Sequence, residues 1–145
     1  MKALQVIGMN HRTAPVDVRE KLAFSPEETR AFLKELHKRD DVTEAVLLST
    51  CNRTELYYFA QNPPEQIADK LYDSLLDFHE VNELDLDQYG YHYNGLRAVK
   101  HCFQVAGSLN SMVVGESQIL GQVKQAYRIA RDEDLCGKFL HQLFQ

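Results

Sequence analysis

Hydrophobic and polar positions in the first part of the chain predict strands and helices in turn. Short, mostly apolar runs typical of buried strands occur at residues 3–9, 44–50, 53–60 and 88–93. Between them, apolar residues at helical spacing predict helices over residues 16–22, 27–38 and 65–79. Ser25, Pro26 and Glu28 form a start signal for the second of these helices, because a serine N-cap and a glutamate three positions later make a capping box.

The order of these elements is β-α-β-β-α-β. Only Cys51 and Asn52 separate the second and third strands, which predicts a hairpin or a sharply bent strand pair. This order is that of the ferredoxin-like, or split βαβ, fold, an α+β architecture with helices on one face of an antiparallel sheet. We assign residues 1–93 to this part of the domain.

The pattern becomes helical from about residue 94. Helical spacing from Leu96 to Ala106 ends at Gly107, and a long amphipathic helix is predicted after Gly115. A last helix is expected to carry Cys136, Phe139, Leu140 and Leu143. Residues 94–145 are therefore predicted to be a C-terminal helical extension. Because the last helical pattern has no stop signal, we expect the chain to be part of a longer polypeptide.

Composition narrows the class of protein. With 145 residues, 44% hydrophobic and 26% charged, the chain is expected to be one soluble globular domain. The net charge of −5 argues against a general nucleic-acid coat protein, although it leaves room for RNA held by local contacts. No membrane span or signal peptide is recognisable, and three widely spaced cysteines favour free thiols, so a cytoplasmic location is expected.

Cys51 is the first candidate for chemistry. It lies in a polar turn between two strands, with Arg53 two residues on. A nucleophilic thiol needs an exposed, electropositive setting, and backbone N–H groups of such a turn can hold an oxyanion. Asn52 tolerates the left-handed conformation that such a turn can require. The residues alone leave an equally good alternative, in which Cys51 is simply a small residue at a strand end.

The other candidate residues are less specific. Arg53 could clamp an acidic substrate, but a surface salt bridge with Glu55 is the simpler interpretation. His101 lies on a largely apolar helix, where a structural histidine is commoner than one that transfers protons. Most of the remaining histidines are expected to be solvated: His11, His37, His79, His92 and His141. A polar run before and into the long helix is interpreted either as caps or as the wall of a binding site: Ser108, Asn110, Ser111, Glu116, Ser117, Gln118 and Gln122.

Two classes of cofactor site are not indicated. The seven glycines form neither a dinucleotide-binding nor a P-loop pattern, so no cofactor site is expected in these residues. No C-x-x-C occurs and no second ligand stands at metal spacing from His101 and Cys102, so no metal is expected.

Three segments resemble glutamyl-tRNA reductase, and the resemblance extends over essentially the whole chain. They are GMNHRTAPVDVREKLAF at residues 8–24, LLSTCNRTELYY at 47–58 and GSLNSMVVGESQILGQVKQAY at 107–127. The resemblance implies that the full-length enzyme uses NADPH to reduce the glutamate of glutamyl-tRNA to glutamate-1-semialdehyde, on the route to 5-aminolevulinate and tetrapyrroles. It also implies a homodimer and contact with glutamate-1-semialdehyde aminomutase. The NADPH-binding and dimerisation domains of the family are expected to lie outside this chain.

The resemblance also assigns roles to individual residues. Cys51 matches the nucleophile that attacks the aminoacyl ester and becomes a thioester, and His101 matches a histidine needed for activity. Arg53 would clamp a carboxylate of the glutamyl group. Substrate-binding positions of the family match Thr50, Cys51, Asn52, Arg53, Ser111, Glu116, Ser117, Gln118 and Gln122. Ser117 departs from the family's usual proline, which should not affect binding through Glu116 and Gln118.

Two other functions compete with catalysis. Ferredoxin-like folds often bind RNA on the sheet face, where Tyr57, Tyr58 and Phe59 would offer rings for stacking and Cys51 would be incidental. A redox-sensing thiol at Cys51 is a weaker alternative. For the chain alone we expect acyl transfer, or slow hydrolysis of the thioester, without reduction.

Overall fold

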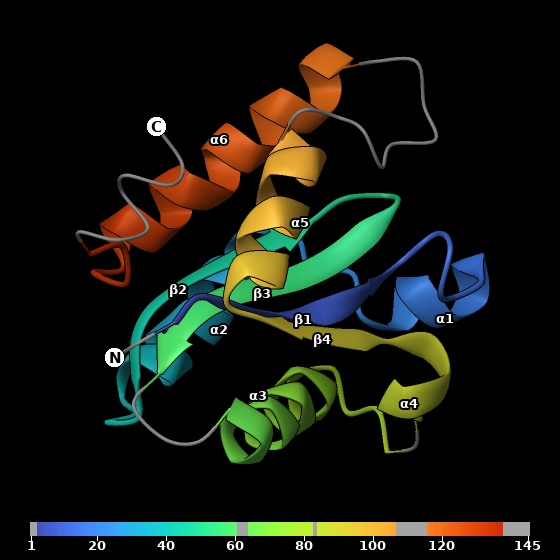
Figure 1. The fold of residues 1–145 in the computed structure, drawn as a ribbon, viewed down its shortest axis with the longest axis horizontal. Coiled ribbons are helices and arrows are strands. Elements are labelled where there is room, and N and C mark those ends of the chain that lie inside the picture. The colour runs from blue at the N-terminus through green and yellow to red at the C-terminus, as the bar shows by residue number, and fades with distance from the viewer. Residues whose placement is uncertain (1–2, 61–63, 83, 107–115, 138–145) are drawn as a thin grey trace.

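The structure is a computed structural model that describes residues 3–60, 64–82, 84–106 and 116–137, without the side chains of residues 86 and 116–120. Strands and helices are interspersed through the first 94 residues, and the helices α5 and α6 follow (Figure 1). In chain order the elements are β1 (Gln5–Asn10), α1 (Val16–Lys21), α2 (Pro26–His37), β2 (Val42–Ser49), β3 (Arg53–Ala60), α3 (Pro64–Phe78), α4 (Leu86–Tyr89), β4 (Tyr91–Asn94), α5 (Leu96–Ala106) and α6 (Glu116–Asp132).

The four strands form one antiparallel sheet in the order β2-β3-β1-β4. β3 therefore lies between β1 and β2, and β1 lies between β3 and β4. This is the split βαβ arrangement, in which α2 connects β1 to β2 and α3 connects β3 to β4. The predicted ferredoxin-like α+β fold is confirmed. The predicted capping box also forms, because the Ser25 Oγ accepts from the Glu28 N–H and the Glu28 carboxylate accepts from the Ser25 N–H.

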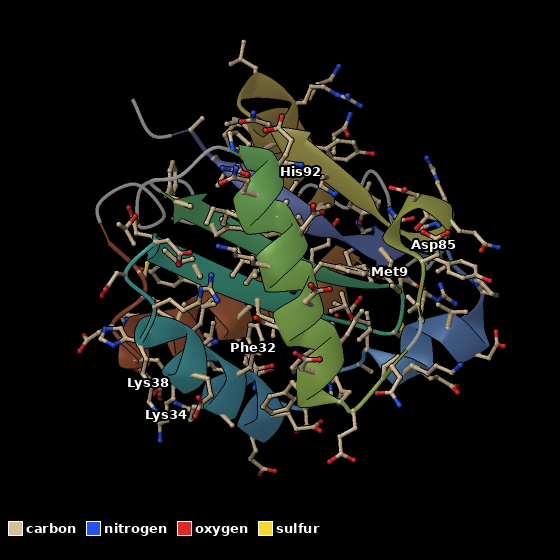
Figure 2. All side chains as sticks on the ribbon, turned by 90° about the horizontal axis from the view of Figure 1, so that it is seen from below. Met9, Phe32, Lys34, Lys38, Asp85 and His92 are labelled. Atoms are coloured by element: carbon tan, nitrogen blue, oxygen red, sulfur yellow. The ribbon has the colours of Figure 1, made fainter. Side chains whose placement is uncertain are left out.

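Helices cover both faces of this sheet. The prediction of helices on one face holds for α2 and α3, which lie side by side with Phe32 between them (Figure 2). α5 lies on the opposite face, and α6 packs along β2 (Figure 1). Cover on both faces is needed because every residue of β1 and β3 is buried. Because side chains alternate between the two faces of a strand, a fully buried strand needs cover on both.

Two predicted elements differ from the structure. The single strand expected over 88–93 is instead the short helix α4 followed by β4, because the Asp85 carboxylate and carbonyl accept hydrogen bonds from the N–H groups that begin α4. The last helix does not include Cys136. α6 ends where Asp134 takes a left-handed φ of 61°, and the Leu135 carbonyl then accepts from the Ala45 N–H at 2.8 Å, at the edge of β2. Phe139, Leu140 and Leu143 lie outside the described residues.

In the described part of the chain, no helix combines the length and the apolar character that crossing a bilayer requires.

Candidate active site

Cys51 lies at the tip of the β2–β3 hairpin, where two residues reverse the chain. The Thr50 N–H donates to the Arg53 carbonyl at 2.8 Å, and the Asn52 N–H donates to the Thr50 Oγ1 at 3.1 Å. This side-chain hydrogen bond tightens the turn in the way that threonine commonly does. The Cys51 residue itself is exposed. The predicted hairpin is confirmed, and it presents the thiol to solvent.

The turn does not require the left-handed backbone conformation that Asn52 would tolerate. Among the described non-glycine residues, positive φ values occur at Glu80 and Asp134. The hydrogen bond from the Asn52 N–H to the Thr50 side chain takes the place of that conformation. Asparagine at this position is therefore not explained by backbone strain.

Hydroxyl groups on either side of the turn attach this end of the hairpin to the segment between α1 and α2. The Ser49 Oγ accepts from the Phe24 N–H at 2.9 Å, and the Thr54 Oγ1 donates to the Leu22 carbonyl at 2.9 Å. Both contacts join residues far apart in the sequence, so the turn is fixed against the helical segment rather than only against its own strands. This fixes the position of Cys51 relative to α1.

The exposed thiol opens onto a pocket between the turn and α1. The pocket has a volume of about 340 Å³. One wall is the turn itself, and the other is formed by residues 16, 19 and 20 of α1 together with residue 23, which follows the helix. The lining residues are Val16, Arg19, Glu20, Ala23, Thr50, Cys51 and Asn52. A small acyl group can therefore reach the sulfur from this side.

Arg53 points into the protein, away from the solvent. Its side chain is 1% exposed, and its Nη1 lies 3.6 Å from the Glu55 Oε2. The expected partner was right, but the pair is buried rather than on the surface. Because alternate residues of a strand share a face, Arg53, Glu55 and Tyr57 all point toward α5. The positive charge of Arg53, next to the turn, is thus paired with the buried Glu55 carboxylate.

Glu55 is the centre of a buried polar network. Its carboxylate accepts from the Tyr57 hydroxyl at 2.7 Å, and it also hydrogen-bonds to the Tyr91 hydroxyl and the His101 Nε2. Burial alone would raise the pKa of this carboxyl. The hydrogen bond from His101, the positive charges of His101 and Arg53 and the Tyr91 hydroxyl outweigh burial, so the pKa of Glu55 lies below its usual value.

The backbone of β1 makes room for this carboxylate. Gly8 pairs with Glu55 across the sheet. A Cβ at Gly8 would lie 2.3 Å from the Thr54 carbonyl oxygen and 2.9 Å from the Glu55 Cα. No side chain fits in that space, so glycine lets the two strands approach where the network is built.

His101 lies at the α5 end of the network. Its side chain is 8% exposed, and the rings of Tyr91 and Tyr93 lie 5.4 and 5.1 Å from its own. It also lines a hollow of about 260 Å³ beside Arg97 and Lys100. The described contacts connect His101 to Arg53 through Glu55, and they include none between His101 and Cys51.

The other two cysteines are poor nucleophiles in this structure. Cys102 is buried, and burial together with the Glu55 charge raises the pKa of its thiol to about 12. Cys136 is half-buried, and burial raises the pKa of its thiol as well. A thiolate is therefore harder to form at both. Among the three cysteines of the sequence, Cys51 is the accessible one.

The predicted polar wall is only partly within the described residues. α6 begins at Glu116, and Gln122 lines a hollow of about 140 Å³ that also includes Ser49, at the start of the turn. Gln122 is thus brought close to the turn end of the hairpin. The side chains of Glu116, Ser117 and Gln118 lie outside the described residues, as does Ser111.

The rings proposed for RNA stacking are not available. Tyr57, Tyr58 and Phe59 are 1%, 0% and 7% exposed. The alternative of base stacking on these rings is contradicted, because helices cover both faces of the sheet.

The sequence reasoning missed two basic residues beside the turn. Arg19 lines the Cys51 pocket, and His11 lies within electrostatic range of Arg19 and Arg53. His11 was grouped with histidines of which most were expected to be solvated, but its Nδ1 is buried. The helical spacing of residues 16, 19 and 20 is the signal that could have identified Arg19. Within the described ranges, no group of three or more His, Cys, Asp or Glu side chains is placed to hold a metal ion.

Comparisons with known proteins agree on one family. A family model described as "Glutamyl-tRNAGlu reductase, N-terminal domain" matches residues 7–145. The glutamyl-tRNA reductase of Rubrobacter xylanophilus is 48% identical over 141 residues, which are 97% of this chain and 32% of that protein. The glutamyl-tRNA reductase of Marinobacter nauticus is 45% identical over 143 residues, 99% of this chain and 33% of that protein.

A solved structure shows the same fold. The glutamyl-tRNA reductase from Methanopyrus kandleri aligns with 99% of this chain and 32% of its own, with a TM-score of 0.73 and 32% sequence identity. The chain thus spans about a third of the length of the curated relatives that it matches.

Proposed function

The chain belongs to the family of glutamyl-tRNA reductase N-terminal domains, and on that premise we propose that it catalyses acyl transfer from glutamyl-tRNA to Cys51. The Cys51 thiolate attacks the carbonyl carbon of the aminoacyl ester. A carbon–sulfur bond forms, the bond from the carbonyl carbon to the tRNA 3′ oxygen breaks, and that oxygen leaves and takes up a proton. The product is a glutamyl thioester on the protein.

The observation that carries this proposal is the accessibility of Cys51 at the tip of a fixed hairpin. The thiol opens onto a pocket of about 340 Å³, whereas Cys102 is buried and Cys136 is half-buried. An activated ester exchanges readily with a thiolate, and a thioester accepts hydride more easily than an ester does. The turn that holds Cys51 therefore has the chemistry and the access that the first half of the reductase reaction needs.

We assign the neighbouring residues to the same reaction. Thr50 and Asn52 set the conformation of the turn. Arg53 supplies positive charge beside it, and the Glu55 network holds that charge in place. The carboxylate clamp at Arg53 stays a prediction, as do the substrate contacts of Ser111, Glu116, Ser117, Gln118 and Gln122. His101 would act on Cys51 through Glu55 and Arg53, since these are the contacts that connect it to the turn.

The described residues do not fit NADPH. A dinucleotide site of the usual kind needs a glycine-rich turn between a strand and a helix at the carboxyl edge of a parallel sheet. This sheet is antiparallel, and the sequence has no such glycine pattern. We therefore propose that NADPH binds outside these residues in the full-length reductase, where glutamate-1-semialdehyde is formed. The homodimer, the contact with the aminomutase and the cytoplasmic location also stay predictions.

This assignment predicts what the chain does alone. Incubated with labelled glutamyl-tRNA and no NADPH, it should release free glutamate slowly, because water hydrolyses a thioester that receives no hydride. Adding NADPH should give no aldehyde. The measurement is the amount of labelled glutamate and labelled aldehyde over time, with glutamyl-tRNA in buffer as the control for spontaneous hydrolysis. NADPH-dependent aldehyde from this chain would contradict the assignment.

A further inference from the structure

Arg19 is a basic residue beside Cys51 to which the proposed acyl transfer gives no role. It projects from α1 and lines the same pocket as the thiol. Its Nε and Nη1 atoms are buried, and neither has a hydrogen-bond partner in the described part of the chain. Buried N–H donors are nearly always paired, because an unpaired one loses its hydration without compensation. Two unpaired N–H donors on one guanidinium at the wall of a pocket indicate a binding site for a group that accepts hydrogen bonds.

His11 shows the same feature close by. Its Nδ1 is buried without a partner in the described residues. Burial and the positive charges of Arg53, Arg12 and Arg19 lower its pKa. Each of the three arginines therefore lies within electrostatic range of His11. In a chain with a net charge of −5, they make a local positive region next to the candidate nucleophile.

We propose that Arg19, with His11 and Arg12 beside it, forms an anion subsite that holds a phosphate of the 3′-terminal nucleotides while Cys51 attacks the ester. This inference rests on the proposed acyl transfer. A guanidinium donates strong, charge-assisted hydrogen bonds to phosphate oxygens, and the unpaired Nε and Nη1 of Arg19 are donors of this kind. The phosphates of the leaving tRNA follow the ester, so one of them reaches the wall of the pocket in which the ester reacts. Glu20 lines the pocket too, but it is exposed, and solvent screens its repulsion.

The first arm of the test asks whether an anion subsite exists, without any tRNA. Cys51 is alkylated with iodoacetate and, separately, with the neutral reagent iodoacetamide. The ratio of the two rates cancels changes in thiol reactivity and reports attraction of the anionic reagent. Arg19→Gln should lower this ratio roughly fivefold. Inorganic phosphate should slow iodoacetate in the wild type and have little effect in the variant.

Matched variants control for charge and folding. Lys21→Gln removes one positive charge from the exposed side of the same helix, outside the pocket, and should leave the ratio nearly unchanged. Arg19→Lys keeps the charge and should retain most of the preference for iodoacetate. Thermal melting of each variant shows that it is folded. An unchanged ratio in a folded Arg19→Gln protein would overturn the subsite.

The second arm identifies the anion. Acyl transfer to Cys51 is measured from glutamyl-tRNA and from 3′-O-glutamyl adenosine, which carries the ester but no phosphate. Arg19→Gln should slow transfer from glutamyl-tRNA about tenfold and change transfer from the adenosine ester less than about twofold. Equal slowing with both substrates would assign the glutamyl carboxylate to Arg19 and overturn the phosphate. If the wild type accepts the glutamyl group from neither substrate, both the proposed function and the phosphate assignment are wrong. The alkylation ratio still shows in that case whether the anion subsite exists.

Discussion

Cys51→Ser lowers acyl transfer from glutamyl-tRNA by roughly a thousandfold or more, and no label remains on the protein. The reason is that a serine hydroxyl at this turn has no adjacent general base to activate it among the described contacts, whereas a thiol ionises at far lower pH. The measurement is a single-turnover experiment with tRNA carrying labelled glutamate and no NADPH, in which protein-bound label is followed over time.

The matched control is Cys136→Ser, at the half-buried thiol. It should leave the rate and the amount of label close to the wild-type values. Label that survives Cys51→Ser, or that disappears in Cys136→Ser, would move the nucleophile away from the hairpin.

Glu55→Gln is expected to destabilise the fold by about 3 kcal/mol, because it removes the only negative charge at the centre of the described network. The amide also places an N–H₂ group where the structure has an acceptor for Tyr57, Tyr91 or His101. Thermal or denaturant unfolding of the variant and the wild type measures the difference. A Tm lower by roughly 10 °C is expected for a chain of this size.

The pH dependence of this difference identifies its cause. The pKa of Glu55 is lowered in the folded state, so its contribution is fully present above the ordinary carboxyl value of about 4.3 and is lost as the pH falls through the lowered pKa. The gap in unfolding free energy should therefore narrow below about pH 4. Glu35→Gln is the control, since Glu35 is exposed, and it should cost less than about 1 kcal/mol. An equally small cost for Glu55→Gln would show that the network does not stabilise the fold.

Much of the fold follows from local patterns that the sequence displays directly. The alternation of strand and helix runs predicted the split βαβ order, and the capping box at Ser25 and Glu28 forms as expected. These features depend on residues close together in the chain. The second layer of helices was harder to predict, because the burial of β1 and β3 on both faces depends on how α5 and α6 pack.

In the candidate site, too, local features could be predicted from the sequence and features that depend on tertiary packing could not. Cys51 could be placed at a hairpin tip because only Cys51 and Asn52 separate the strands predicted over 44–50 and 53–60. The burial of Arg53 with Glu55 could not be predicted, because it depends on His101 and Tyr91, which are 46 and 36 residues from Glu55 along the chain. Arg19 faces Cys51 only because hydroxyls on the hairpin bind the segment after α1. Contacts of this kind come from tertiary packing, and periodicity does not reveal them.

The most direct test of the account asks where the glutamyl group is attached and by what bond. The chain is mixed with glutamyl-tRNA without NADPH, quenched in acid within one turnover, digested and analysed by mass spectrometry. We expect one glutamyl adduct, on the peptide that contains Cys51, which neutral hydroxylamine removes as expected for a thioester. An adduct on another residue would contradict this assignment. So would a wild-type protein that forms no adduct and releases free glutamate no faster than Cys51→Ser does.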